Sequence, residues 1–312
     1  MASKVISTGN SNATHISRII KAAQALNLED YSTKPSGVWG STATIECNGV
    51  TINSAELDFE ITVPFDDNLE SNEGEIIVYN LSDNTLNQLV VGKTLTIEAG
   101  YEGDTGVIFS GEVRKVDTKR DGADRATTIR VIDGVTTSTA KLIEDGKIAD
   151  SYDGVPAKDI LWALLEAEGS PIATSKDDIK SDYTYENSVS IGDDLQAEIK
   201  KFSEVCGVST FKVNGKIYCC KLEDVSNDVA FDASEETGMI GSPSPFEKVV
   251  KVGDTEETIK GFKIEMLLQH RAAVGAIVNL KSEQYTGKYY IQQGTHRFNQ
   301  NEATTSIEVV EK

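Results

Sequence analysis

The sequence predicts a mainly β protein in which a small α+β unit lies between two β regions. In residues 55–63, apolar and polar side chains alternate with a period of two, as in a strand with one buried face. In residues 156–206 the apolar side chains recur instead at helical spacing, and the two-residue period returns after residue 259. A chain of 312 residues exceeds the size at which a single core stops growing, so we expect two or three compact units.

The first β region is predicted to span residues 40–135. Besides 55–63, its strand candidates are 42–47, 75–79, 94–101, 107–117 and 127–133. Glycine-containing turns separate them, among them Glu102-Gly103-Asp104 and Asp121-Gly122. Six short strands at close spacing are typical of an antiparallel barrel or sandwich.

Residues 136–236 are predicted to form the α+β unit. Pro156 suits the first turn of a helix whose apolar residues recur at helical spacing through residue 165. A second helix covers 195–206, where Leu195, Ile199, Phe202 and Cys206 share one face and Gly207 ends the helix. Asn214-Gly215 between 209–213 and 216–220 then predicts a tight β-hairpin.

Residues 237–312 are predicted to form the second β region. Its strand candidates are 259–268, 276–281, 288–292 and 304–310. Residues 1–39 form a separate N-terminal extension, in which Ile16, Ile19, Ile20, Ala23 and Leu26 indicate a short amphipathic helix.

Composition and charge exclude several classes of protein. The chain has 50 acidic and 30 basic residues, and its net charge of −20 repels phosphate backbones, so we expect no sequence-specific binding of nucleic acid. No apolar run reaches the roughly 18 residues of a membrane span, and no secretory signal is indicated. The four cysteines are too few and too scattered for a disulfide scaffold. We therefore expect a soluble chain without membrane insertion.

The sequence offers no convincing active site. The three histidines, His15, His270 and His296, lack the spacing that places two metal ligands on one helix face. No nucleophile elbow, Walker loop or dinucleotide-binding glycine motif occurs. Residues 117–124 lack the spacing and final glutamate of a calcium loop, which favours a hairpin turn. We expect no catalytic residue, metal or cofactor.

One row of acidic side chains needs separate consideration. Glu56, Asp58 and Glu60 share one face of the 55–63 strand, about 7 Å apart at two-residue spacing. That separation is near the one that glycosidase carboxylates use, but such a row is more often a solvated face.

Several sequence blocks follow one another in a recognisable order. Residues 74–113 read GEIIVYNLSDNTLNQLVVGKTLTIEAGYEGDTGVIFSGEV and continue into RATTIRVIDG at 125–134; further blocks are 195–224, 237–247, 259–282 and 287–310. Within the first block stand the motifs Val78-x-Asn80-Leu81-Ser82, Ala99-Gly100-Tyr101 and Ile108-Phe109-x-Gly111-x-Val113. In this order and spacing, the blocks resemble phage tail baseplate hub proteins, the XkdQ-like and gpD-like hubs related to VgrG.

The resemblance covers residues 40–312 and implies a mechanical part. Its implied fold is two tube-like antiparallel β-barrels, at 40–135 and 237–312, flanking the helix-containing domain at 136–236; 237–247 resembles the family's linker. It implies a homotrimer that forms a pseudo-sixfold ring and adapts a sixfold tail tube to a threefold spike. The implied partners are the tail tube or distal tube protein, the central spike protein, the tape measure protein and other baseplate proteins. The implied place is the tail baseplate of a virion or phage-tail-like particle, assembled in the bacterial cytoplasm.

In such a ring, the acidic charge would line a channel for DNA or effector. Three copies of this chain would carry a formal charge of −60, and acidic walls would keep DNA from adhering. Glu56, Asp58 and Glu60 are the candidates for channel-facing residues, with Glu265 as their counterpart in the second β region. Outer solvent or a subunit contact is the alternative environment for the same side chains.

Three other functions compete with the hub. A distal tail or tube-tip protein would normally need only one barrel. A tail-associated cell-wall hydrolase would need a paired acid and nucleophile or a zinc cluster. A carbohydrate-binding β module would usually expose aromatic side chains, which make up only 7% of this chain.

Overall fold

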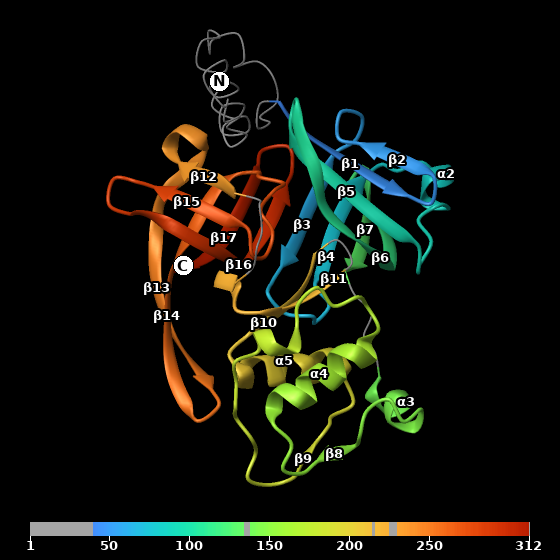
Figure 1. Cartoon of the computed structure of the whole chain (residues 1–312). Helices are drawn as coiled ribbons and strands as arrows, with labels where there is room; N and C mark the ends of the chain where they lie inside the picture. The colour runs from blue at the N-terminus through green and yellow to red at the C-terminus, as the bar shows by residue number, and fades with distance from the viewer. Residues whose placement is uncertain (1–39, 134–137, 214–215, 225–229, 312) are drawn as a thin grey trace, which may run out of the picture.

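The computed structural model describes residues 40–133, 138–213, 216–224 and 230–311. Strands dominate, and the longer helices gather in one unit, which lies between two β units in chain order and below both of them in Figure 1. The mainly β fold with a small helix-containing insert is therefore confirmed. The expected N-terminal helix and the Asn214-Gly215 turn lie outside the described residues.

The first β unit comprises residues 40–133. Its elements are β1 (Ser41–Cys47), β2 (Val50–Asn53), β3 (Phe59–Phe65), β4 (Glu73–Tyr79), α2 (Asp83–Leu86), β5 (Thr94–Tyr101), β6 (Asp104–Asp121) and β7 (Asp124–Ile132). The alternation predicted for 55–63 begins later than expected, since β3 starts at Phe59. The backbone carbonyl of Asn53 accepts from the amides of Glu56 and Leu57, and this turn takes residues 54–57 out of the strand.

The middle unit comprises residues 138–224. Its elements are α3 (Thr139–Glu144), β8 (Ser151–Tyr152), α4 (Ala157–Glu168), a 3-10 turn (Lys176–Asp178), β9 (Val189–Ser190), α5 (Leu195–Cys206), β10 (Ser209–Val213), β11 (Lys216–Cys220) and a second 3-10 turn (Leu222–Asp224). α5 and the β10–β11 pair have the predicted bounds. The Asp194 side chain accepts from two first-turn amides, and Gly207 ends α5 with a φ of 66° that other residues rarely adopt.

The second β unit comprises residues 230–311. Its elements are β12 (Ala230–Ser234), a 3-10 turn (Glu235–Thr237), β13 (Met239–Val252), β14 (Thr255–Leu267), β15 (Ile277–Lys281), β16 (Thr286–Phe298) and β17 (Ala303–Glu311). The stretch 237–247, which the resemblance likens to a linker, lies in β13 from Met239 onward. β12 precedes residue 237 but pairs in parallel with β15, so it belongs to this unit.

One continuous sheet joins the two β units. Its strand order is β13-β14-β17-β16-β3-β4-β7-β6-β5-β1-β2, and β15 links β12 to the edge of β16. The link between the units is the antiparallel pairing of β16 with β3. β2 pairs only with β1 and β13 only with β14, so among the described strands neither unit closes into the barrel that the resemblance implies.

The two β units have the same strand arrangement. The first has the sheet order β3-β4-β7-β6-β5-β1, and the second has β13-β14-β17-β16-β15-β12. The strands correspond one to one in chain order, with two differences. β2 is extra, and β12 pairs in parallel with β15 whereas β1 pairs antiparallel with β5. A β-bulge falls at the same place in both, between Val113 and Lys115 of β6 and between Ile291 and Gln293 of β16. The molecule thus contains a structural repeat with the middle unit inserted between its copies.

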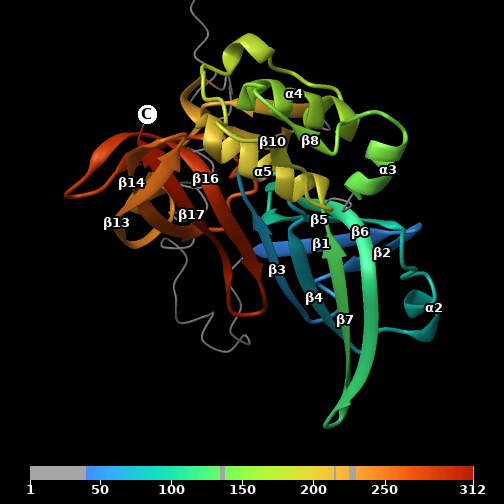
Figure 2. The same cartoon turned by 90° about the horizontal axis from the view of Figure 1, so that it is seen from below.

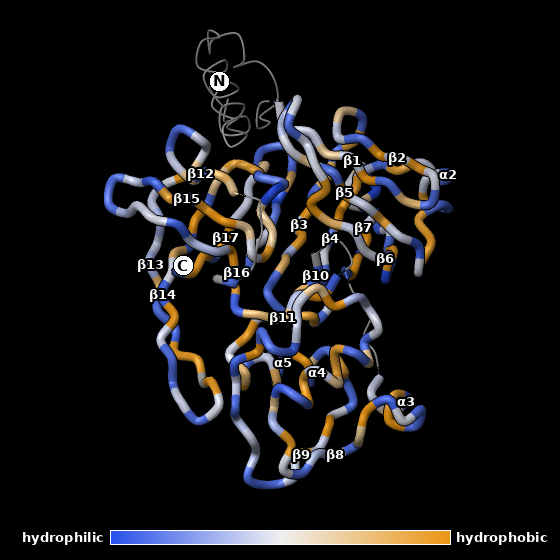
Figure 3. The backbone as a smooth tube through the Cα atoms, in the orientation of Figure 1, coloured by the Kyte–Doolittle hydropathy of each residue, from blue (hydrophilic) through white to orange (hydrophobic). Residues whose placement is uncertain are grey.

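Apolar side chains fill the interior of each unit. The first core includes Phe59, Ile61, Ile76 and Ile97, and it also receives Phe298 from the β16–β17 hairpin of the second unit. The hydrophobic stretches follow the strands, whereas the connecting loops are largely hydrophilic (Figure 3). Burial of this alternating apolar set is the main stabilising term for the sheet.

The repeat gives the molecule two distinct ends. The β3–β4 and β13–β14 hairpins turn at the end where the middle unit lies, and the β6–β7 and β16–β17 hairpins turn at the opposite end (Figure 2). At the first end, Thr210 N–H donates to the Asp67 carbonyl at 3.2 Å and Lys200 pairs with Glu70 at 2.5 Å. We call these the middle-unit end and the far end.

Candidate channel face and sheet edges

The eight strands from β13 to β6 present one uncovered face. Directly paired residues of antiparallel strands point to the same side. Glu60 lies opposite Ile77, and Glu265 lies opposite Ser306. The register through Thr62 and Arg297 places both glutamates on the same face, away from the cores. The structure thus brings two of the four candidate channel residues onto one surface.

The other two candidates do not lie on this sheet. Glu56 is in the turn before β3, and Asp58 directly precedes the strand. The prediction that Glu56, Asp58 and Glu60 lie on one strand is therefore wrong, because the Asn53 turn contains Glu56 and β3 begins one residue after Asp58. Both side chains are exposed near the far end, since the Asp58 carbonyl accepts from the amide of Tyr79, where β4 ends.

The uncovered face carries both signs of charge. Ion pairs join Lys263 to Glu308 at 2.6 Å and Lys115 to Asp117 at 2.5 Å. The Lys115 ammonium lowers the pKa of the Asp117 carboxyl by hydrogen bonding. Further pairs link the Arg130 guanidinium to Glu73 at 2.7 Å and to Glu75 at 3.1 Å. The face is thus a charge-mixed surface and not the acidic strip that the sequence suggested.

The junction of β3 with β16 is a close contact between backbones. Five residue pairs form the ladder, from Gly294 opposite Phe65 to Phe298 opposite Ile61. A Cβ atom at Gly294 would clash with the Phe65 ring and would stand 2.7 Å from the Ser306 carbonyl oxygen. Glycine is therefore required there by the close approach of the neighbouring strand and ring.

Polar contacts reinforce the junction. Arg271 makes two hydrogen bonds to the Asp104 carboxylate, at 2.6 and 3.0 Å, and both side chains are largely buried. The Tyr101 hydroxyl donates to the Ala303 carbonyl at 3.0 Å in the interior. A bidentate guanidinium–carboxylate pair fixes orientation as well as distance, so it holds the two units in one geometry.

A buried histidine lies at the centre of the junction. His296 pairs opposite Val63, hydrogen-bonds Thr305 at 2.9 Å and packs 4.9 Å from the Phe65 ring. Burial lowers the pKa of its imidazole to about 4. The ring is thus neutral at pH 7 and part of the core, so no proton-transfer role follows from its position.

A cleft of about 650 Å³ adjoins His296 where all three units meet. Its walls include Asp133 from the first unit, Lys212 from the middle unit and His270 from the second. Burial raises the pKa of the Asp133 carboxyl and lowers that of His270. Among these wall residues, no nucleophile is hydrogen-bonded to a base, so they do not form a catalytic pair. The cleft is a contact region between the three units.

Two sheet edges correspond to the junction strands but lack a partner strand. Within the described residues, β13 pairs only with β14, and the second half of β6, residues 113–121, pairs only with β7. β13 corresponds to β3, and this half of β6 corresponds to the half of β16 that pairs with β3. Because the bulge falls at the same place in β6 and β16, positions in the two strands can be matched by their distance from it. On this count, Lys119 of β6 corresponds to Arg297 of β16. Through the pairing with β14, Ser244 corresponds to Thr62.

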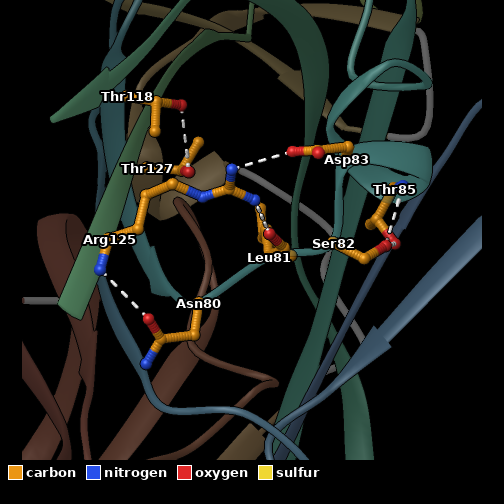
Figure 4. A network of polar contacts seen from close by, with 8 residues as sticks. All are labelled: Asn80, Leu81, Ser82, Asp83, Thr85, Thr118, Arg125 and Thr127. Carbon is orange, nitrogen blue, oxygen red and sulfur yellow. Dashed lines mark hydrogen bonds and ion pairs between the residues drawn. The ribbon is translucent and has the colours of Figure 1, made fainter. Parts of the chain in front are cut away.

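The Asn80-Leu81-Ser82 motif holds the β6–β7 hairpin near its turn. Asn80 has a φ of 58°, and its side chain accepts from the amide of Arg125 at 3.0 Å. The Arg125 guanidinium donates to the Leu81 carbonyl and pairs with Asp83 at 2.8 Å (Figure 4). Leu81 is buried, and Ser82 caps α2 by accepting from the Thr85 amide. The motif is therefore a structural clamp that fixes the path of the hairpin.

Features of metal or membrane sites are not found in the described residues. No group of three or more His, Cys, Asp and Glu residues there is placed to hold a metal ion. All four cysteines are buried and unbonded, and burial raises the pKa of Cys206 to about 11 and that of Cys219 to about 12. No helix in the described residues is long and apolar enough to cross a membrane.

Sequence reasoning missed the residues that form the junction. Asp104 and Arg271 are 167 positions apart, and nothing in their local sequence marks them as partners. Gly294 interrupts a strand-like run and could have indicated a close backbone approach.

Comparison with known proteins identifies the fold. No family model matches the sequence, and no curated protein matches it. The 43 kDa tail protein of prophage MuSo2 from Shewanella oneidensis matches with a TM-score of 0.56 at 9% identity, over 87% of this chain and 98% of that chain. A tail protein from Neisseria meningitidis MC58 matches with a TM-score of 0.53 at 8% identity, over 88% and 97% of the two chains.

A third similar structure comes from a secretion system. An E. coli component of the type VI secretion system, itself described as similar to the T4 tail proteins gp27 and gp5, matches with a TM-score of 0.51 at 10% identity. This match covers 86% of this chain and 76% of that chain. At such identities the likeness establishes a shared fold, and the fold is that of phage tail and related secretion proteins.

Proposed function

We propose that this chain is a structural subunit of a phage or phage-like tail, in which three copies form a ring between a sixfold tail tube and a threefold spike. The first β unit, at 40–133, and the second, at 230–311, would form the wall of the ring, and the middle unit, at 138–224, is inserted between them. The proposed role is structural and not enzymatic, and two solved structures that share the fold are described as tail proteins.

The proposal rests on the repeat and on its strand edges. Inside the chain, β3 pairs with β16. The corresponding edges, on β13 and on the second half of β6, have no partner strand among the described residues. Inside one chain, an edge of the second unit pairs with a different edge of the first, which is a head-to-tail contact. A head-to-tail contact that is repeated by the same rotation closes into a ring. Pairing β6 of one chain with β13 of the next would repeat the internal contact, and three chains would supply six β units.

The uncovered sheet face is the candidate wall of the channel. Eight strands per chain would form a continuous lining, and Glu60 and Glu265 would both face the lumen. Many basic side chains there are neutralised within ion pairs. A lining without a free cationic strip would not hold a DNA backbone, so DNA or effector passes without adhering.

β13 contains two residues that explain how the free chain avoids pairing with itself. Pro243 and Pro245 have no N–H to donate, and proline on an edge strand is a common guard against unwanted sheet extension. The ring contact would therefore be weaker than the internal junction, and partners would promote its closure.

Light scattering of the purified chain, alone and mixed with the spike protein of the same tail, tests the proposal. We expect a threefold mass in at least one of the two samples. A monomer in both, with no binding of the spike protein, would contradict the ring and would favour a tube-tip subunit.

A further inference from the structure

We infer that Val249 of one chain packs against Val90 and Val91 of a second copy, in an apolar contact beside the pairing of β13 with β6. This inference rests on the proposed ring and names the side chains that would hold its open contact. It follows from a comparison of the two copies of the repeat, because the copy that is paired inside the chain shows what covers this position.

Exposed apolar side chains concentrate at the open edges. In the part of the chain that the structure describes, the large apolar side chains that are exposed are Val90, Val91, Val107, Ile240 and Val249. Val90 and Val91 lie in the loop before β5, and Ile240 and Val249 lie on β13. All except Val107 therefore lie on or beside the two strand edges that would meet between chains.

The loop before β5 has a counterpart in the second β unit, the loop before β15. Two backbone hydrogen bonds fix each loop beside the β-bulge that both units share. They run from the amide of Gly92 to the carbonyl of Val113 and from the amide of Val113 to the carbonyl of Lys93, and likewise from Gly275 to Ile291 and from Ile291 to Ala276. The residue before each glycine therefore occupies the same place, so Val91 corresponds to Val274.

These two valines differ in burial. Val274 is 6% exposed, whereas Val91 is 60% exposed. Val274 belongs to a buried cluster with Phe211 of the middle unit, and Phe65 of β3 packs against that cluster. The junction of β3 with β16 therefore helps to cover at Val274 a place that stays open at Val91. Covering the open place would remove further apolar surface from water.

The β13–β14 hairpin reaches beyond the rest of its sheet. β17 pairs with β14 only from Gly261 onward, whereas β13 and β14 pair with each other as far as Val252 opposite Thr255. We call residues 248–260 the arm; in Figure 1 it runs down beside the middle unit. The arm touches its own middle unit, since Val252 lies close to Gly207 at the end of α5. Val249 is 64% exposed, so its side chain is open to another chain.

The repeat places Val249 beside the neighbouring loop. By the correspondence of β13 with β3, Val249 corresponds to Asp67. Inside the chain, the Asp67 carboxylate accepts from the side chain of Gln292, the bulge residue of β16, at 3.0 Å. The same contact between chains would bring Val249 to Arg114, the bulge residue of β6, next to the loop that carries Val91. An exposed valine of each chain would thus be covered where the internal junction has a polar contact.

Matched serine variants test the contact. Val91→Ser and Val249→Ser each remove the apolar side chain from one side of it, and exposed positions of this kind tolerate substitution without unfolding. Val107→Ser is the control, because Val107 is 55% exposed but lies in the half of β6 that pairs with β5. Light scattering over a concentration series measures association. The sample is the chain alone or with the spike protein, whichever gives the unsubstituted chain a threefold mass.

We expect Val91→Ser and Val249→Ser to weaken association about tenfold per contact, which is the effect of exposing one buried valine. Val107→Ser is expected to leave association unchanged. A threefold mass that is equally stable in all four proteins, or equal losses in the three variants, would overturn the inference.

A charge pair tests whether the two sides meet. Val249→Lys would place an ammonium beside Arg114 and the loop of the next chain, so it should weaken association by more than the serine variant. Val91→Glu in the same chain should restore part of the loss, because every contact would then carry opposite charges. Losses that simply add would show that Val91 and Val249 do not meet. The proposed function fails separately, and earlier, if the unsubstituted chain has a threefold mass in neither sample.

Discussion

The two β units share a strand order, but one of two corresponding edge strands is paired and the other is open. β3 of the first unit is covered by β16, with Gly294 packed under the Phe65 ring. β13, its counterpart, has two prolines and no partner on its outer edge among the described strands. The same architecture thus provides a permanent contact inside the chain and an open one at its ends. In the proposed ring, the open strand edges would therefore form the contact between chains.

A larger side chain at Gly294, in the junction of β3 with β16, is expected to reduce the stability of the fold most. Gly294→Val introduces the residue that stands at the corresponding position of β6, Val116. The added side chain would meet the Phe65 ring and the Ser306 backbone, so we expect a loss of about 3 kcal/mol in the free energy of unfolding. Urea denaturation of both forms measures it. The control Val116→Ala, on the open edge, should cost about 1 kcal/mol or less, and equal losses would contradict the comparison.

Acid should weaken the closed junction through His296. Burial holds its folded pKa near 4, below the unfolded value near 6.5, so the unfolded chain binds the extra proton first. Stability is therefore full above about pH 6.5 and falls as the pH drops toward 4, by up to about 3 kcal/mol. Denaturation at a series of pH values measures this slope. The slope over that window should flatten in His296→Gln, and an unchanged slope would show that other groups set it.

Removing the buried ion pair should have a smaller effect. Arg271→Met leaves the Asp104 carboxylate without its bidentate partner, so we expect a loss of about 2 kcal/mol. A double-mutant cycle with Asp104→Asn isolates the pair, and its coupling energy should exceed about 1 kcal/mol. Additive single effects would mean that the pair does not couple the two units.

The clamp at the β6–β7 hairpin should matter least to stability. Arg125→Ala removes the hydrogen bond to the Leu81 carbonyl and the pair with Asp83, which is exposed, so we expect a loss of about 1 kcal/mol. Amide hydrogen exchange should show faster opening of residues around Asn80 and no change in β14. Faster exchange throughout the sheet would contradict a local role for the clamp.

Local signals in the sequence predicted most of the fold. The bounds of α5 followed from its apolar spacing and from Gly207, and those of the β10–β11 pair from alternation. β13 was missed because Gly241, Pro243 and Pro245 resemble a linker, although proline is tolerated on a strand edge. The start of β3 was missed because the alternation continues through a turn fixed by the Asn53 carbonyl.

The candidate site was predictable only in part. Alternation placed Glu60 and Glu265 on exposed strand faces, but only the pairing of β3 with β16 puts them on the same face. That pairing joins segments more than 200 residues apart, and the Arg271–Asp104 contact has no counterpart in the local sequence. The mixed charge of the face was likewise invisible, because the basic partners of its acids lie on neighbouring strands.

Cross-linking of the two open edges tests the ring most directly. Lys119→Cys with Ser244→Cys places thiols at the positions that correspond to Arg297 and Thr62, which lie directly opposite each other inside the chain. Facing strand residues of this kind lie within disulfide reach. The matched control, Thr62→Cys with Arg297→Cys, should link within one chain. After mild oxidation, the account predicts a covalent species of three chains for the first pair and of one chain for the second. If the first pair yields only single chains, or an open series of ever larger oligomers, a closed ring of three is contradicted.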